Sequence, residues 1–343
     1  MSCTVGADMR SQDFLHQNAE TPYSEDYIAA GAVCRLSTNS AALLAAARAS
    51  FLPSEELPVL ADFSLRFWVD NTDLAQPPWP KPYLRGLGHL VFVGFDTQSS
   101  VLADLGTRRV IGRFSAAMAC DSKYWTRVIF PMLLSIMAGS VGAVELHASC
   151  VARDAQGLIL MGPSRSGKST LAMALREAGF RVLSDDRTFC TVKPGKLQAY
   201  GLPRPLKLRR EAGNWFEEFR DREPTDIQNG ERVFYCEPNP LMGEQRFPAC
   251  EPQAIVFLER QEHLCFRLTR MECDEVISRI EPDLLAEDRF AIQEQRKTLE
   301  NLLELPALRL QYGGSPQDVA RQIGATLLNS EELNNSEFLG GTR

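Results

Sequence analysis

The residue types best suited to chemistry in this chain gather around Gly162, Lys168 and Ser169. Residues 162–170, called the glycine loop below, fit the pattern G-x-x-x-x-G-K-[ST] at every fixed position. In such a loop, successive backbone N–H groups surround an anion, and the dipole of the following helix favours negative charge there. The lysine can reach the β- and γ-phosphates, and the next hydroxyl can bind Mg²⁺. We therefore expect ATP and Mg²⁺ to bind to the loop, whose residues are Gly162, Pro163, Ser164, Arg165, Ser166, Gly167, Lys168, Ser169 and Thr170.

The segments that flank the glycine loop support this interpretation. Residues 157–161 form a short apolar run that predicts a buried strand, and residues 171–175 continue at helical spacing. A strand, a glycine-rich loop and a helix, in that order, are the context that the motif requires.

Two adjacent aspartates, Asp185 and Asp186, follow Lys168 by 17 and 18 residues. About ten residues of helix, a reversal at Gly179 and about five residues of returning strand fill this interval. The carboxyl end of that strand therefore comes back beside the glycine loop, where ligands bind in such sheets. Neighbouring strand residues point in opposite directions, so we expect one carboxylate to face Mg²⁺ and the other an acceptor hydroxyl. The alternative is a solvated turn, because serine and aspartate also cluster in turns.

The whole chain has the composition of a soluble globular protein of one large or two smaller domains. Its 343 residues carry a net charge of −7, which argues against a nucleic-acid partner. Its nine cysteines form no Cys-x-x-Cys pair, which indicates reduced thiols in a cytoplasmic protein. Residues 1–20 are polar and mixed in charge and contain no apolar run, so we expect no secretory signal. The apolar residues 128–144 include Pro131, Gly139 and Gly142, so we expect a buried core helix and no membrane partner.

Along the chain, the pattern of apolar residues divides into four parts. Residues 1–25 are expected to be a loose leader, and residues 26–143 a β-rich α+β region. In this region we expect strands over residues 63–69, 90–95, 100–105 and 109–114, a helix after Asn39 or Ser40, and a later helix that contains Trp125 and the apolar run. Residues 144–330 alternate strands and helices, beginning with a strand over residues 144–151 and including a hairpin over residues 188–200. Further strands are expected over residues 254–259, 266–270 and 307–312. Residues 331–343 are expected to be a tail.

Residues 147–209 resemble the catalytic domain of HPr kinase/phosphorylase and of HPr-kinase-related proteins. Members of that family have a histidine on the strand before the loop, then the loop and its helix, then a paired aspartate at this same short spacing. The histidine here is His147, which precedes Lys168 by 21 residues. Related kinases that modify ribosomal peptides, such as lasso-peptide precursors, resemble the chain in three segments: residues 146–148, the glycine loop and residues 183–186. The resemblance implies an α/β fold with a P-loop kinase core of the HPr kinase C-terminal domain type.

The resemblance also implies roles for individual residues. Asp186 would accept the proton of an acceptor serine, and Asp185 would support the Mg²⁺ shell. Lys168 and Ser169 would hold phosphates and Mg²⁺, and His147 would lie near the reacting phosphate. Taken alone, a histidine such as His147 is more often a satisfied core residue.

The chain departs from the family pattern after the predicted hairpin. The place of the family's magnesium-binding glutamate carries Lys207 instead, with Glu211 nearby. Arg204, Lys207 and Arg209 belong to a basic cluster that is either a solvated face or a contact for phosphate or an acidic peptide. Arg165 stands where many such loops have glycine, so a positive φ there would cost on the order of 1 kcal/mol. Alternatively, its guanidinium could contact a phosphate.

Together these features predict a cytoplasmic kinase that transfers the γ-phosphate of ATP to a serine of a peptide or protein. A small-molecule hydroxyl kinase and a non-catalytic nucleotide-binding regulatory protein are the alternatives. The sequence leaves open whether the N-terminal region binds the acceptor or assembles a homo-oligomer.

Overall fold

The computed structural model describes residues 20–54, 60–70, 76–202, 205–226, 231–236, 249–280 and 289–326. Most of the expected leader, the whole expected tail and Arg204 lie outside these residues. The chain is a mixed α/β protein that divides into two compact units. Unit 1 comprises Met1–Val141 with Glu287–Gln293, and unit 2 comprises Gly142–Ala286 with Glu294–Arg343.

Unit 1 is built on an eight-stranded sheet in the order β3-β1-β2-β4-β8-β7-β6-β5. Strands β2, β4 and β8 pair in parallel, and the other neighbours are antiparallel. The strands are β1 (Tyr23–Ala29), β2 (Ala32–Thr38), β3 (Leu52–Pro53), β4 (Phe63–Asp70), β5 (Tyr83–Leu87), β6 (Leu90–Gly94), β7 (Ser100–Asp104) and β8 (Arg109–Ser115).

Helices supply the rest of the unit 1 core. Helix α1 (Ala41–Ser50) begins at Ser40, whose side chain accepts a hydrogen bond from the backbone of Leu43, so the second of the two expected caps is confirmed. After α2 (Ala116–Cys120) and α3 (Ser122–Tyr124), a π-helical turn leads into α4 (Phe130–Ala138). The ring of Phe130 lies 5.0 Å from that of Trp125, and both side chains are buried. By length and composition alone Ser122–Val141 would suffice to cross a membrane, but its apolar side chains pack in this core, as expected.

Unit 2 is built on a nine-stranded sheet in which β12, β10, β11, β18, β14, β13 and β9 follow one another, and β20 and β19 extend from β18. Strand β11 pairs in parallel with β18, and β18 with β20. The strands are β9 (Val144–Leu146), β10 (Ser149–Arg153), β11 (Gln156–Met161), β12 (Arg181–Ser184), β13 (Thr188–Lys193), β14 (Lys196–Gly201), β18 (Ala249–Arg260), β19 (Cys265–Arg270) and β20 (Ala307–Gly313).

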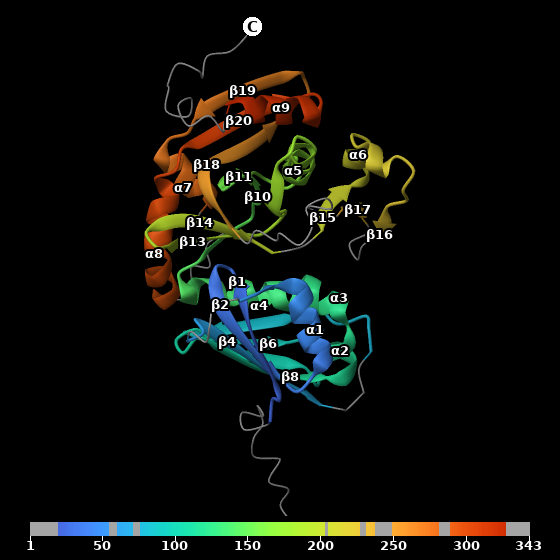
Figure 1. Ribbon diagram of the computed structural model, residues 1–343, viewed down its shortest axis with the longest axis vertical. Coiled ribbons are helices and arrows are strands. Elements are labelled where there is room, and N and C mark those ends of the chain that lie inside the picture. Colours follow the sequence, from blue (N-terminus) through green and yellow to red (C-terminus); the bar gives the residue numbers. More distant parts are fainter. Residues whose placement is uncertain are drawn as a thin grey trace, which may run out of the picture. The chain divides into compact units, whose positions relative to one another are not determined.

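Helices and a small second sheet complete unit 2 (Figure 1). Helix α5 (Lys168–Glu177) packs against β10, β12 and α9 (Pro316–Thr326). A three-stranded sheet joins β15 (Leu206–Arg209), β17 (Arg232–Cys236) and β16 (Thr225–Asp226), and short α6 (Arg210–Gly213) follows β15. Helices α7 (Cys273–Ile280) and α8 (Arg289–Leu303) follow β19, and the part of α8 before Glu294 belongs to unit 1.

Several elements of unit 2 match the sequence prediction closely. The hairpin of β13 and β14 forms, with Gly195 in its turn at a φ of 81°. Gly179 has a φ of 89° just after α5, as a glycine that ends a helix should. The expected strands within β18, β19 and β20 are also present.

One prediction near the glycine loop is wrong: residues 144–151 are not a single strand. Strand β9 pairs with β13, whereas β10 pairs with β11 and β12, and His147 and Ala148 lie in the break between them. Two hydrogen bonds of Ala148 hold the break: its N–H donates to the Leu146 carbonyl at 2.8 Å, and its carbonyl accepts from the Thr188 hydroxyl at 2.9 Å. His147 therefore lies between strands and not on one.

Candidate functional site

The glycine loop connects β11 to α5, and part of its backbone has positive φ angles, which residues other than glycine adopt only at a cost. Gly162, Arg165 and Gly167 have φ values of 152°, 71° and 95°. A side chain at Gly162 would collide with Ser166, because its Cβ would lie 2.6 Å from the Ser166 hydroxyl oxygen. The loop is therefore tightly curled, and Arg165 does occupy a left-handed conformation.

Lys168 is the first residue of α5, and its side chain folds back to the start of the glycine loop. Its side chain is only 8% exposed, and its Nζ donates a hydrogen bond of 2.7 Å to the carbonyl of Gly162. No side chain caps the start of α5, since Gly167 occupies the cap position. The first N–H groups of the helix are thus free of a side-chain cap and carry the positive end of the helix dipole.

Asp185 lies just past β12 and faces the start of α5. Its carboxylate accepts a hydrogen bond from the side chain of Ser169 and one of 2.9 Å from the backbone N–H of Lys207. The Ser149 hydroxyl donates to the Asp185 carbonyl at 2.5 Å. Burial raises the pKa of Asp185, and these hydrogen bonds to Lys207 and Ser169 oppose the rise. The two residues expected to bind metal, Ser169 and Asp185, are thus joined to each other.

Asp186 turns away from Asp185 toward the break that contains His147. The His147 Nδ1 lies 3.1 Å from the Asp186 Oδ1, and these two side chains are 51% and 64% exposed. The hydrogen bond from His147 holds the pKa of Asp186 below its usual range, and the charges of Arg187 and Lys168 act in the same direction. Asp186 is therefore an accessible carboxylate that stays ionised at neutral pH.

The pieces of backbone that carry these side chains are tied together. The Ser184 and Thr188 hydroxyl oxygens lie 2.6 Å apart, which closes the turn around the aspartate pair. Arg187 forms an ion pair of 2.6 Å with Glu145 on β9. The turn after β12 is therefore attached to the strand that leads into His147.

The basic cluster is arranged differently from the rest of the predicted site. Lys207 and Arg209 lie on β15, and both approach Glu231, at 4.0 Å and 2.7 Å. The Lys207 residue reaches Asp185 through its backbone N–H rather than its side chain. Arg204 lies outside the described residues.

Sequence reasoning missed two residues that touch the site. Ser149 holds the Asp185 backbone, and Tyr312 on β20 donates a hydrogen bond of 2.6 Å to the carbonyl of Ser166. Tyr312 stands 146 residues beyond Ser166 in the sequence, so no local spacing could have connected them. Ser149 follows His147 by two residues, and its closeness to that motif was the one available signal.

The chemistry of the donor atoms suits Mg²⁺ bound together with phosphate. Mg²⁺ prefers oxygen ligands, and it usually combines one or two carboxylates with waters and substrate phosphates. Ser169 and Asp185 offer a hydroxyl and a carboxylate at the mouth of the glycine loop. Within the described residues, no group of three or more His, Cys, Asp and Glu side chains is placed to hold a metal ion by itself.

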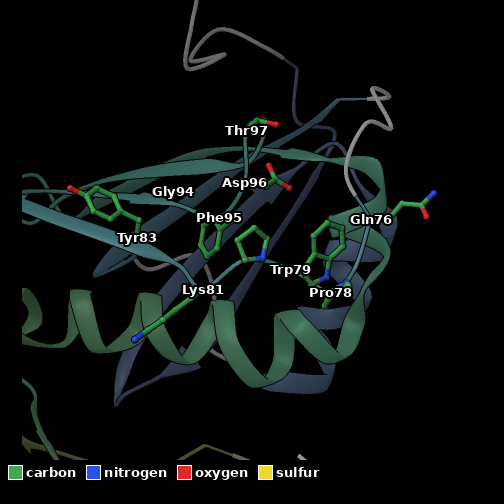
Figure 2. A pocket seen from close by; sticks show the side chains of 10 residues that line it. Gln76, Pro78, Trp79, Lys81, Tyr83, Gly94, Phe95, Asp96 and Thr97 are labelled. Atoms are coloured by element: carbon green, nitrogen blue, oxygen red, sulfur yellow. The ribbon is translucent and has the colours of Figure 1, made fainter. Parts of the chain in front are cut away.

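A separate hollow of about 520 Å³ lies in unit 1, and we call it the Trp79 hollow. Figure 2 shows Trp79, Phe95 and Pro78 around it, with Lys81 pointing away from Asp96, which also lines the hollow. The indole N–H of Trp79 donates to Asp121 at 2.8 Å, which fixes this wall. The hollow presents rings and prolines rather than a glycine loop with paired carboxylates, so the glycine loop is the candidate site for phosphate chemistry.

Comparisons with known proteins give distant likenesses among solved structures only. No family model matches the chain, and no curated protein matches it. Among solved structures, the chain is similar to the Hpr(Ser) kinase/phosphatase from Coxiella burnetii, with 13% sequence identity and a TM-score of 0.29. The match covers 55% of this chain and 98% of that chain.

Proposed function

We propose that this protein is an ATP-dependent kinase that transfers the γ-phosphate to a serine hydroxyl of a peptide or protein. The observation that carries the proposal is that the two adjacent aspartates have different partners and different exposure to solvent. Asp185 is hydrogen-bonded to Ser169 at the start of α5, whereas Asp186 is paired with His147 at 3.1 Å and is exposed. One carboxylate thus serves the nucleotide side of the site, and the other serves an incoming hydroxyl.

The glycine loop would hold the triphosphate. Its curled backbone and the uncapped start of α5 direct N–H groups at an anion. Lys168 can exchange its hydrogen bond with the Gly162 carbonyl for a phosphate oxygen. Ser169 and Asp185 would hold Mg²⁺, which supplies positive charge against the phosphates when bound.

Asp186 would position the acceptor and take its proton. Phosphoryl transfer depends mainly on positioning and charge stabilisation, so a carboxylate of low pKa is adequate for orienting a hydroxyl. His147 holds the Asp186 carboxylate through Nδ1, and the Arg187 side chain ties the same turn to Glu145. The exposure of Asp186 and His147 favours a large acceptor such as a peptide segment over an enclosed small molecule.

The decisive variant is Asp186→Asn. We expect transfer from γ-labelled ATP to serine peptides to fall by at least about 100-fold, because the group that orients the hydroxyl and takes its proton is lost. ATP affinity should change by less than about threefold, a small fraction of the transfer effect. Asp221→Asn is the matched control, since Asp221 is an exposed aspartate of the same unit outside the site.

The acceptor is tested in the same assay by offering pools of peptides and of small hydroxylated metabolites. Label on serine peptides supports the proposal, and label on metabolites alone supports a small-molecule kinase. ATP binding without transfer to any acceptor supports a regulatory nucleotide-binding protein. Unchanged transfer by Asp186→Asn would show that Asp186 is not the base.

A further inference from the structure

Tyr312 contacts the glycine loop from the side of the sheet. It lies on β20, its side chain is 5% exposed, and its hydroxyl donates a hydrogen bond of 2.6 Å to the Ser166 carbonyl. Ser166 is the residue before Gly167, and α5 begins one residue later. The tyrosine therefore holds the last peptide unit before the helix.

This contact determines where the next backbone N–H points. A trans peptide unit is planar, so the carbonyl of Ser166 and the N–H of Gly167 point in opposite directions. Because the carbonyl is turned toward Tyr312, the Gly167 N–H is turned away from Tyr312. An N–H directed away from the sheet at the start of a helix is suited to donate to a bound phosphate.

The fit between Tyr312 and Gly167 is close. A Cβ at Gly167 would lie 2.2 Å from the Tyr312 hydroxyl oxygen, so only glycine leaves room for the hydroxyl there. Gly167 also has a φ of 95°, which other residues adopt at a cost. Burial raises the pKa of Tyr312 to about 12, so its hydroxyl keeps its proton and remains a donor throughout the neutral range.

The strand behind Tyr312 is well anchored. Strand β20 lies between β18 and β19, with Tyr312 opposite Arg260 on one side and Phe266 on the other. The backbone carbonyl of Tyr312 also accepts a hydrogen bond of 2.8 Å from the backbone N–H of Gln261. A donor held on the interior of a sheet is suited to fixing a loop in one geometry.

We propose that Tyr312 is a positioning residue that holds the Ser166–Gly167 peptide unit so that the Gly167 N–H is oriented in advance toward a nucleotide phosphate. The proposal rests on the proposed function, since it requires phosphate to bind in the glycine loop. Tyr312 itself touches no phosphate, and it acts only through the backbone of the loop.

The test is Tyr312→Phe, which removes the hydroxyl and keeps the ring. One hydrogen bond of this kind corresponds to a factor of about three to ten, so the dissociation constants of Mg-ATP and Mg-ADP should rise by that factor. The Michaelis constant for ATP should rise equally while kcat stays within about twofold, because the contact acts alike on bound substrate and transition state. Tyr200→Phe on β14 is the matched control, and it should leave nucleotide affinity unchanged.

A structural role alone would give a different result. Tyr312→Phe would then lower the thermal midpoint measured without nucleotide and leave the dissociation constants equal to those of the wild type, which would overturn the proposal. If the wild type itself binds neither ATP nor ADP, the proposed function fails first. Weaker nucleotide binding in Tyr312→Phe with an unchanged Tyr200→Phe supports the proposal.

Discussion

Asp185 and Asp186 are neighbours in sequence, yet their surroundings move their pKa values in opposite directions. Burial raises the pKa of Asp185, whereas the hydrogen bond from His147 lowers that of Asp186. Pairs of titratable groups that are driven apart in this way commonly have different chemical roles. The difference supports assigning Asp185 to the metal side and Asp186 to the acceptor side.

The raised pKa of Asp185 leads to a prediction about stability and pH for Asp185→Asn. An aspartate whose folded pKa exceeds its unfolded value binds more protons when folded, so stability falls as the pH rises between those two values. The variant has no titratable carboxyl group at residue 185, so it lacks this loss of stability with rising pH. We therefore expect Asp185→Asn to gain stability relative to the wild type as the pH rises above about 4, the ordinary pKa of an aspartate, as measured by urea unfolding at several pH values.

The same variant should lose function while it gains relative stability. Removing a carboxylate from the metal side should weaken Mg²⁺-dependent ATP binding by at least about tenfold. Titrations of ATP with and without Mg²⁺ separate the metal-dependent part. An Asp185→Asn variant that binds Mg-ATP as tightly as the wild type would contradict the metal assignment.

At the residue scale, sequence spacing brings the proposed chemical groups together, but it does not reveal the residues that hold them in place. The aspartate pair follows from the length of one helix and one strand, which is local arithmetic. The backbone N–H of Lys207 and the hydroxyl of Tyr312 reach the site through tertiary pairing, so spacing alone says nothing about them. The positive φ considered for Arg165 is present at 71°, with its expected cost of about 1 kcal/mol.

At the scale of elements, the carboxyl end of β12 is held in place by its crossing with β14. A Cβ at Gly201 would lie 1.7 Å from the carbonyl oxygen of Leu183, two residues before Asp185. Gly201 therefore permits the close backbone approach that sets the position of the aspartate pair. No flexible side chain is available to move aside, because the obstacle is backbone.

We expect Gly201→Ala to displace β12 and the aspartate pair. Overpacking of this kind costs about 1–3 kcal/mol, which urea unfolding would measure. A shift of about 1 Å in Asp186 should also lower phosphoryl transfer by about 100-fold. Gly86→Ala is the control, because the nearest atom to its added Cβ is 4.0 Å away. Wild-type stability in Gly201→Ala would show that this crossing tolerates a side chain.

The elements that the sequence predicted are those with a strong repeat of apolar residues or with clear turn residues at their ends. Strands β4, β7, β8 and β20 have alternating burial, and the hairpin has its Pro-Gly turn. Strand β5 was missed because all five of its side chains are exposed, which removes the apolar alternation. Strand β15 was missed because its four residues are at the lower limit of length at which alternation identifies a strand.

At the scale of the whole molecule, the two units offer two different kinds of surface. Every described residue of the candidate site belongs to unit 2, from His147 to Tyr312. The Trp79 hollow belongs to unit 1, and its aromatic walls are of a kind that can also stack against a nucleotide base. The location of nucleotide binding therefore separates the proposed site from its strongest competitor.

Hydrogen exchange of the full chain with and without Mg-ATP makes this separation. We expect slower exchange in peptides that cover the glycine loop, residues 144–150, residues 183–190 and residues 306–314, because the bound phosphate closes these segments around it. At ATP concentrations about 100 times the dissociation constant, the stabilisation should approach about 2.7 kcal/mol. Peptides over residues 76–98 should exchange as before.

Lys168→Met is the control, since it keeps the loop but removes the charge that holds the phosphates, and it should abolish the protection. Protection centred on Trp79 and Phe95 instead would place the nucleotide in unit 1 and contradict the assignment of the glycine loop.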